Sequence, residues 1–273
     1  MMRSYLHLVV ITSLVLLTIG LGTAFTVGGI SLYMPPLEVR SLAKIYLNTT
    51  FNTNFALSPL SPEAVTAIVW DYRGLDTLFE TSVMFLAIVG ALMIFRGLGE
   101  RVPGPGSGGG GLSLIVKTVT RLTTIMIVAV GISIAFHGHL TPGGGFQGGA
   151  TIAVAPMLMI IAFSVHFLAQ RVPVKRAVLL RSAGLAAIAV TTYLVLLVAL
   201  TRGGYAYIFQ NQPKVGAPYG IPSYVGDATV LGGTLLLFNV AEMFAVAFGF
   251  VALLILITVP EAPAKEVVLK GED

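Results

Sequence analysis

Long apolar runs alternate with polar segments along this chain, and about six of the runs are long enough to cross a lipid bilayer. A spanning helix needs about 20 mostly apolar residues, because each residue adds about 1.5 Å across a hydrocarbon core about 30 Å thick. We place the six runs at about residues 5–33, 78–95, 112–135, 141–170, 177–200 and 228–259. The pattern predicts an all-α integral membrane protein with about six transmembrane helices.

The first run has a second interpretation, since Gly22-Thr23-Ala24 could be the cleavage site of a signal peptide. The apolar core of a signal peptide is usually about 7 to 15 residues long, and this run is longer. We therefore favour a retained first helix that ends before Pro35-Pro36.

The segment between the first two runs is polar, so we expect it outside the membrane. Residues 61–63, Ser-Pro-Glu, are typical of a helix start. We expect a short outer surface helix over residues 64–71, with Trp70 and Tyr72 at the membrane interface.

Residues 102–111 are nearly all glycine, proline and serine, a composition that favours a flexible connector over a packed core. We expect this linker to join two modules. The first, residues 1–101, would hold two helices, the second, residues 112–259, would hold four, and residues 260–273 would form a cytoplasmic tail.

The composition supports the membrane assignment. Hydrophobic residues make up 56% of the 273 residues, charged residues only 10%, and the mean hydropathy is +0.91. A soluble protein of this size needs more charge to cover its surface, so a soluble globular protein is excluded.

The charges also orient the helices. With both termini in the cytoplasm, the cytoplasmic segments carry eleven of the 16 Lys and Arg residues, as the positive-inside rule requires. We therefore attribute the net charge of +4 to topology and expect no nucleic acid partner. We expect a multi-pass protein in the cell membrane.

The chain contains no cysteine, which excludes disulfides and cysteine-ligated iron–sulfur clusters within it. His137 and His139 are close together, but two histidines without a third ligand are a poor metal site. We expect no cofactor and no bound metal, and any redox centre would belong to another subunit.

Residues 136–150, which we call the glycine-rich stretch, lie between the third and fourth runs and contain five glycines within seven residues. Thr141 is a candidate N-cap with Pro142 at the first helical position. Small residues let membrane helices approach closely, so this helix start is predicted to press against neighbours. The predicted packing motif consists of Pro142, Gly143, Gly144, Gly145, Gly148 and Gly149.

Two further features belong to this stretch. Gly143, Gly145 and Gly148 match a dinucleotide-binding pattern, but that pattern needs a preceding strand and a later acidic residue, and apolar sequence follows instead. Pro156 should kink the fourth helix, because it removes a backbone hydrogen bond.

The stretch from Gly138 to Gly149 reads G-H-x-x-P-G-G-G-F-x-G-G. It resembles the signature of the MnhB/MrpB family, the B subunits of multisubunit Mrp sodium/proton antiporters. Relatives occur in archaeal membrane-bound hydrogenases and sulfane sulfur reductases. The resemblance extends over about residues 112–259.

A second resemblance precedes the linker. Residues 71–80 match D-x-R-x-x-D-T-x-x-E, a segment at the C-terminal end of the antiporter A subunit, which is a separate, MbhE-like small subunit in membrane-bound hydrogenases. This similarity covers about residues 6–101 and implies a fusion of two modules. Phe79 departs from the family, where glycine is common at this position.

Together the resemblances imply a subunit of a prokaryotic Mrp-type antiporter module within a hydrogenase or sulfur reductase complex. Its partners would be antiporter-like and small membrane subunits, the lipid bilayer, sodium ions and protons. The subunit would serve ion movement and would have no catalysis of its own.

Glu242 is the sharpest candidate for chemistry, because it lies near the centre of the sixth run. An acidic side chain at that depth costs about 2.5 to 3.5 kcal/mol by insertion scales, so it requires a partner, a proton or a function. Asn239, one turn earlier, could hydrogen-bond to it. The alternative is a protonated Glu242 that holds two helices together.

Asp76 and Glu80 are four residues apart, so a helix places both carboxylates on one face. They could pass protons, but Thr77 and Glu80 also match a capping box, which is purely structural. The resemblance favours ion movement, since the matching acids of A subunits are implicated in it. Arg73 would pair with Asp71 or Asp76.

His139, with its ordinary pKa near 6.5, could relay protons at the outer mouth of the third and fourth helices. For His137 we favour hydrogen bonding at the interface, and His166 is less informative. Residues 171–181 are basic and are interpreted as an anchor against anionic lipid. The candidates for ion translocation are Asp71, Arg73, Asp76, Glu80, His139, Asn239 and Glu242.

Three functions are therefore open. The first is ion translocation as a subunit of a larger complex, and the second is a structural spacer that seals the interface between antiporter-like subunits. The third is a stand-alone transporter, which predicts inverted repeats that the two halves do not display.

Overall fold

The computed structural model describes residues 2–26, 39–51, 56–95, 111–221, 224–225, 229–230 and 232–258. The chain forms two compact units, Met1–Lys44 and Ile45–Asp273, and each is described by itself. Apart from Gly111, the expected linker lies outside the described residues, as does the expected tail. The division into modules therefore stays a prediction.

The first unit consists mainly of α1 (Met2–Thr26). Its large apolar side chains between Val9 and Leu21 are exposed, as expected for a helix that faces lipid or another protein. The helix predicted from the first run is therefore present, and residues 27–33 of that run lie outside the described residues.

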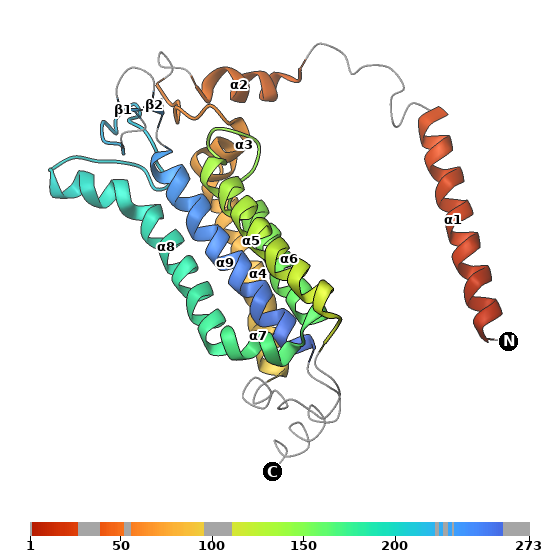
Figure 1. The fold of residues 1–273 in the computed structure, drawn as a ribbon. Helices are drawn as coiled ribbons and strands as arrows, with labels where there is room; N and C mark the ends of the chain where they lie inside the picture. Colours follow the sequence, from red (N-terminus) through yellow and green to blue (C-terminus); the bar gives the residue numbers. More distant parts are fainter. Residues whose placement is uncertain are drawn as a thin grey trace. The chain divides into compact units, whose positions relative to one another are not determined.

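The second unit is helical (Figure 1). Five of its described helices are long and apolar enough to cross a membrane. These five are α4 (Gly74–Ile94), α5 (Leu114–His137), α6 (Gly145–Ala162), α8 (Val174–Thr201) and α9 (Gly233–Ile257). Shorter described elements are α2 (Ser41–Thr49), α3 (Ala64–Thr66), the π-helix η1 (Ala67–Tyr72) and α7 (Val165–Arg171). The predicted all-α membrane fold is confirmed.

The described residues include one small antiparallel pair of strands. Strand β1 (Tyr224–Val225) pairs with β2 (Thr229–Val230), so that Tyr224 lies opposite Val230. This pair lies in the connection between α8 and α9 and does not alter the helical class.

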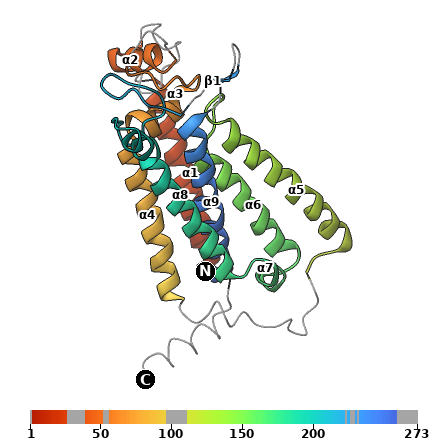
Figure 2. The same ribbon diagram turned by 90° about the vertical axis from the view of Figure 1, so that its left-hand side faces the viewer.

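Helix α9 forms the centre of the second unit. Its apolar window is 61% buried, against 17% for α4 and for α5. In Figures 1 and 2 it lies between α8 and α6, and it also contacts α4, α5 and η1. A helix that is apolar on all sides can be buried in this way, because every face then meets other helices.

Glycines set the close packing around α9. A Cβ on Gly148 would lie 2.6 Å from the Gly131 carbonyl oxygen on α5, and one on Gly149 would lie 2.7 Å from Cβ of Val246 on α9. On α8, a Cβ at Gly184 would lie 2.6 Å from the Ala241 carbonyl oxygen. These contacts leave no room for larger side chains, so the helices pack backbone to backbone.

The start of the fourth predicted helix requires a correction. Helix α6 begins at Gly145 with Gly144 at its N-cap, and the expected start at Thr141 and Pro142 is wrong. Gly143 and Gly144 have φ of 157° and 153°, a conformation that favours glycine and that holds the chain extended before the helix begins. The Thr141 hydroxyl instead donates to the His137 carbonyl oxygen at 3.3 Å.

The predicted fourth helix is also broken into two. Helix α6 continues past Pro156 and ends at Ala162, and α7 starts after Ser164, whose hydroxyl accepts a hydrogen bond from Phe167 N at 3.2 Å. Ser164 caps α7 as a typical N-cap residue. The chain therefore turns before α8, and the kink expected at Pro156 stays a prediction.

Successive long helices of the second unit run antiparallel, so that the connecting segments gather at its two ends (Figure 1). One end, which we call the glycine-turn end, holds η1, the connection between α5 and α6, and residues 202–221. There Glu63 N donates to the His139 carbonyl oxygen at 3.2 Å. We call the opposite end the α7 end.

Candidate functional site

Glu242 is buried on the third turn of α9, with 8% of its surface exposed. Its Oε2 accepts a hydrogen bond from Phe146 N at 3.0 Å. Phe146 is the second residue of α6, so the carboxylate meets the positive end of that helix, where free backbone N–H groups favour an anion. The glycine-rich stretch thereby supplies a specific partner for the central acid.

This contact depends on Gly145. A Cβ at that position would lie 2.6 Å from the Glu242 Cβ and 2.7 Å from its Oε2. Any larger residue would push α6 away from α9 and lengthen the bond to Phe146 N. The glycine therefore brings a helix start and a carboxylate together across 96 residues of sequence.

Glu242 faces a cavity of about 260 Å³ between α4, α9, η1 and the start of α6. Glu80 of α4 is the other ionisable residue that lines it. The remaining lining residues are Val65, Thr66, Val69, Trp70, Thr77, Thr81, Met84, Gly143, Gly144, Phe146, Gln147, Asn239 and Val246. The cavity thus combines two carboxylates with hydroxyl and amide groups.

Two buried N–H donors on the cavity wall lack a hydrogen-bond partner among the described residues. They are Trp70 Nε1 and Asn239 Nδ2. Because buried polar groups are nearly always hydrogen-bonded, these donors indicate that the cavity accommodates water or an oxygen-bearing ligand. Asn239 does not bond to Glu242 here, although their spacing suggested that it could.

Trp70 requires a correction. The expected surface helix exists as α3 and η1, and Glu63 caps it by accepting from Thr66 N at 2.5 Å. Trp70, however, is fully buried and stacks on Phe238 of α9, with ring centroids 4.4 Å apart and planes 5° apart. It belongs to the core and not to the membrane interface. Tyr72 is partly exposed and its hydroxyl donates to Thr49 Oγ1.

Asp76 and Glu80 have separate surroundings, although they lie on one helix. Asp76 is 52% exposed and forms an ion pair with Arg73, whereas Glu80 lines the cavity. The capping box is absent: α4 begins at Gly74, and the Thr77 hydroxyl donates to the Val69 carbonyl oxygen at 2.5 Å. Asp76 is therefore not placed beside Glu80 in the cavity.

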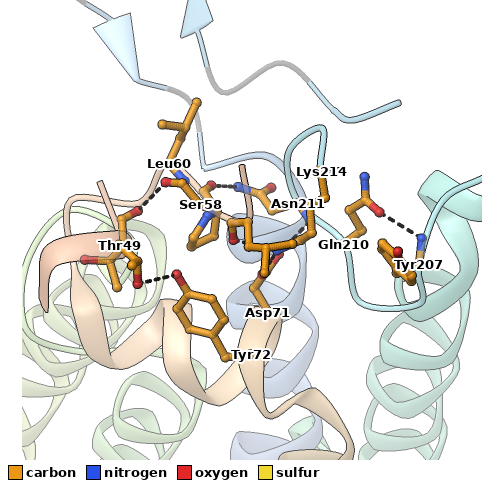
Figure 3. A network of polar contacts seen from close by, with 12 residues as sticks. Thr49, Ser58, Leu60, Asp71, Tyr72, Tyr207, Gln210, Asn211 and Lys214 are labelled. Atoms are coloured by element: carbon orange, nitrogen blue, oxygen red, sulfur yellow. Dashed lines mark hydrogen bonds and ion pairs between the residues drawn. The ribbon is translucent and has the colours of Figure 1, made fainter. Parts of the chain in front are cut away.

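Asp71 belongs to a polar network at the glycine-turn end, drawn in Figure 3. Its side chain is fully buried and pairs with Lys214, while Asn211 N donates to its Oδ2 at 2.9 Å. Asn211 also donates to the Pro59 carbonyl oxygen at 2.8 Å and accepts from Thr234 N at 2.9 Å. The network ties residues 202–221 to η1 and to the start of α9.

Burial and the polar partners of Asp71 act on its pKa in opposite directions. Burial raises the pKa of the Asp71 carboxyl, whereas the Lys214 ammonium and the Asn211 amide act to lower it. Arg73, which the sequence suggested as a partner of Asp71 or Asp76, pairs with Asp76, and the partners of Asp71 are Lys214 and Asn211. Lys214 and Asn211 are 143 and 140 residues from Asp71 in the chain. They meet Asp71 only because the connection between α8 and α9 folds back over η1, which no local sequence pattern indicates.

His139 is buried beside Gly232, and its carbonyl oxygen accepts from the Ser61 hydroxyl at 3.1 Å. Burial, followed by the nearby His137, lowers the pKa of His139, so the ring is neutral at neutral pH. His137 is exposed, with Nδ1 2.9 Å from the Ser133 carbonyl oxygen, and His166 contacts Gln170. Within the described residues, no three potential ligands gather as a metal site.

The fold and the cavity define a class: a multi-pass helical membrane protein with a carboxylate buried between its helices. Residues 115–252 match the model of a family described as a domain related to the MnhB subunit of Na⁺/H⁺ antiporters. The match covers half of the chain, and the chain belongs to this family. The resemblance noted for residues 112–259 is thereby confirmed.

Curated relatives agree with this assignment. An uncharacterized protein of Methanocaldococcus jannaschii is 34% identical over 45% of this chain and 52% of its own length. A putative antiporter subunit mnhB2 of Staphylococcus haemolyticus is 37% identical over 22% of this chain and 43% of its own length. The chain thus spans about half the length of the curated relatives it matches.

Two solved structures are similar. A chain of the membrane-bound sulfane sulfur reductase, an archaeal respiratory membrane complex, is 27% identical with a TM-score of 0.64, covering 92% of this chain and 98% of the other. A chain of the Mrp complex from Dietzia sp. DQ12-45-1b is 18% identical with a TM-score of 0.53, covering 93% of this chain and 26% of the other, and shares the fold.

Proposed function

We propose that this protein is an ion-translocating membrane subunit of an Mrp-type module within a respiratory membrane complex. Both termini would face the cytoplasm, and the chain would join an A-subunit-like module to its MnhB-related module. The similarity to a chain of an archaeal respiratory complex supports this proposal, because it extends over 92% of the present chain and not over the MnhB region alone.

The observation that carries the proposal is the Glu242 cavity. A buried carboxylate that forms no direct salt bridge with a described residue can exchange a proton or bind a sodium ion, and it faces space in which either could move. If Glu242 served only to hold α6 against α9, we would expect tightly packed side chains around it and no cavity. Glu80 is exposed on α4, so we infer that the route from Glu242 leads through Glu80 toward a neighbouring subunit.

Substitution of the two cavity acids tests this function. Glu242→Gln and Glu80→Gln remove the charge with little change of volume, and each is expected to reduce sodium-dependent proton transport in inverted vesicles by at least tenfold. The amount of assembled complex should stay near that of the wild type. Asp76→Asn removes an exposed carboxylate from the same helix and is expected to transport normally.

A structural spacer is the second candidate, and the polar network around Asp71 and the glycine contacts of α6 favour it. The network and the glycine contacts stabilise the second unit whether or not ions move through the Glu242 cavity. Normal transport in both Glu242→Gln and Glu80→Gln, with intact assembly, would establish the spacer and reject translocation through this cavity. An active purified monomer would instead favour a stand-alone transporter.

A further inference from the structure

Arg181 is a buried positive charge on α8 without a hydrogen-bonding partner for two of its nitrogens. The residue is 3% exposed, and neither Nε nor Nη1 has an acceptor among the described residues. Its guanidinium carbon lies 4.5 Å from the ring centroid of Phe85 on α4. A guanidinium cannot lose its proton in a protein, so it requires an anion or water oxygens nearby.

This position differs from the lipid anchor expected for residues 171–181. Arg171 and Arg176 are exposed at the α7 end, but Arg181 is buried and lies about 10 Å along α8 from its first residue, Val174, at about 1.5 Å per residue. It therefore points into protein and not toward lipid headgroups.

The acidic residues of the described part of the chain leave two carboxylates that could balance this charge. Glu63 caps α3, Asp71 pairs with Lys214 and Asp76 pairs with Arg73. The remaining two are Glu80 and Glu242, which have neither a cationic partner nor a helix of their own to cap, and both line the cavity between α4 and α9.

Arg181 is separated from that cavity by a single layer of side chains. It lines a second, small cavity of about 10 Å³ between α4, α8 and α9. Thr81, Met84 and Val246 line both cavities. A hydroxyl group and a flexible thioether thus form most of the wall between Arg181 and the Glu242 cavity.

The other ionisable groups on the elements around α9 do not face Glu242. Helix α6 has no ionisable side chain, and η1 directs Asp71 toward Lys214. The remaining groups of α5, α7 and α8 do not line the cavity; these are Lys117, Arg121, His137, His166, Arg171, Lys175 and Arg176. Glu80 is therefore the charged residue that shares the cavity with Glu242, and Arg181 is the buried charge that lies behind the cavity wall.

We propose that Arg181 is the fixed positive charge that stabilises ionised Glu242, acting across the wall of Thr81, Met84 and Val246. Arg181 is a positioning residue that keeps its own proton while Glu242 gains and loses one. This inference rests on the proposed function only in its consequence for transport, because the charge coupling can be measured without transport.

The coupling is tested by labelling Glu242 with a hydrophobic carbodiimide in the purified complex. Carbodiimides react with protonated carboxyl groups, and peptide mass spectrometry separates label on Glu242 from label on Glu80. Without the positive charge, Glu242 keeps its proton to higher pH, so Arg181→Gln should raise the pH midpoint of labelling by about one pH unit. Arg181→Lys, which keeps the charge, should stay near the wild-type midpoint.

Arg176→Gln is the matched control, because it removes an exposed arginine from the same helix. Solvent screens that charge, so its midpoint should not move. A midpoint for Arg181→Gln equal to that of the wild type or of Arg176→Gln would overturn the proposal.

A double-mutant cycle covers the case in which Arg181→Gln does not assemble. Coupled charges predict that Arg181→Gln lowers the apparent Tm less when Glu242→Gln is also present, and that the double variant recovers assembly lost in the single one. Equal losses in both backgrounds, or no recovery, would contradict the coupling. Unchanged transport in Glu242→Gln would reject the proposed function and leave the labelling shift intact.

Discussion

Buried charges in the second unit are balanced in three different ways. Asp71 pairs directly with a lysine, and Glu242 accepts a hydrogen bond from a backbone N–H at a helix start. The guanidinium of Arg181 lies against an aromatic ring, and two of its nitrogens have no acceptor among the described residues. A paired charge resists exchange, whereas a carboxylate held by one amide beside a cavity can change its protonation state. This difference separates Asp71, a structural residue, from Glu242.

The structural role of Asp71 leads to a prediction. Asp71→Asn would leave Lys214 buried without its counter-charge, and losing one member of a buried pair typically costs about 3 to 5 kcal/mol. We expect a clear fall in the apparent Tm of the purified protein, measured by a thermal shift assay.

The exposed pair of Arg73 and Asp76 is the control for this experiment. Its side chains are 62% and 52% exposed, and solvent-exposed pairs contribute only about 0 to 1 kcal/mol. Asp76→Asn should therefore leave the Tm almost unchanged. Equal destabilisation by the two substitutions would show that Asp71 is not the stronger structural contact.

At the scale of elements, the small residues of α6 determine how near it lies to α5 and α9. Glycine weakens a helix in water, but here the missing Cβ permits contacts that no other residue allows. The position of the α6 start, and with it the bond from Phe146 N to Glu242, follows from this packing.

Matched glycine substitutions test the role of α6. Gly148→Ala would place a Cβ 2.8 Å from that of Ala135, and overpacking of this kind costs about 1 to 3 kcal/mol. Gly90→Ala on α4 meets nothing within 4 Å and should be neutral or slightly stabilising. The apparent Tm of the two variants measures the difference, and a stable Gly148→Ala protein would refute close packing at this point.

At the scale of the whole molecule, the five long helices of the second unit place the glycine-turn end and the α7 end on opposite sides of a membrane. The basic residues of α7 and of the α8 start lie at one end, and from the positive-inside rule we propose that this end faces the cytoplasm. The acidic cavity and the Asp71 network lie toward the other end.

The absence of native cysteine makes this topology straightforward to measure. Thr141→Cys and Lys175→Cys introduce single thiols at exposed positions of the two ends. A membrane-impermeant maleimide should label position 141 from outside intact cells and position 175 only in inverted vesicles. Labelling of both from one side would contradict α6 as a spanning helix, and the reverse pattern would invert the assigned topology.

Much of this architecture could be predicted without coordinates. Hydropathy is a sum over neighbouring residues, so it identified the long helices. It merged α6 with α7, because Phe163 and the single polar residue Ser164 between them barely lower that sum. It also placed Trp70 at the interface, since an aromatic residue next to polar sequence is ambiguous until its partner Phe238 is known.

The sequence by itself determined the membrane class, most of the long helices and the glycine-rich signature of the family, and it named one acid in the last helix as a candidate for ion translocation. The tertiary structure alone decided which polar groups meet. Glu80 reaches the cavity while Asp76 does not, Lys214 neutralises Asp71, and Arg181 lies behind the wall of the cavity that Glu242 faces. Local patterns depend on neighbours in the chain, whereas these contacts depend on how segments far apart in the sequence pack together.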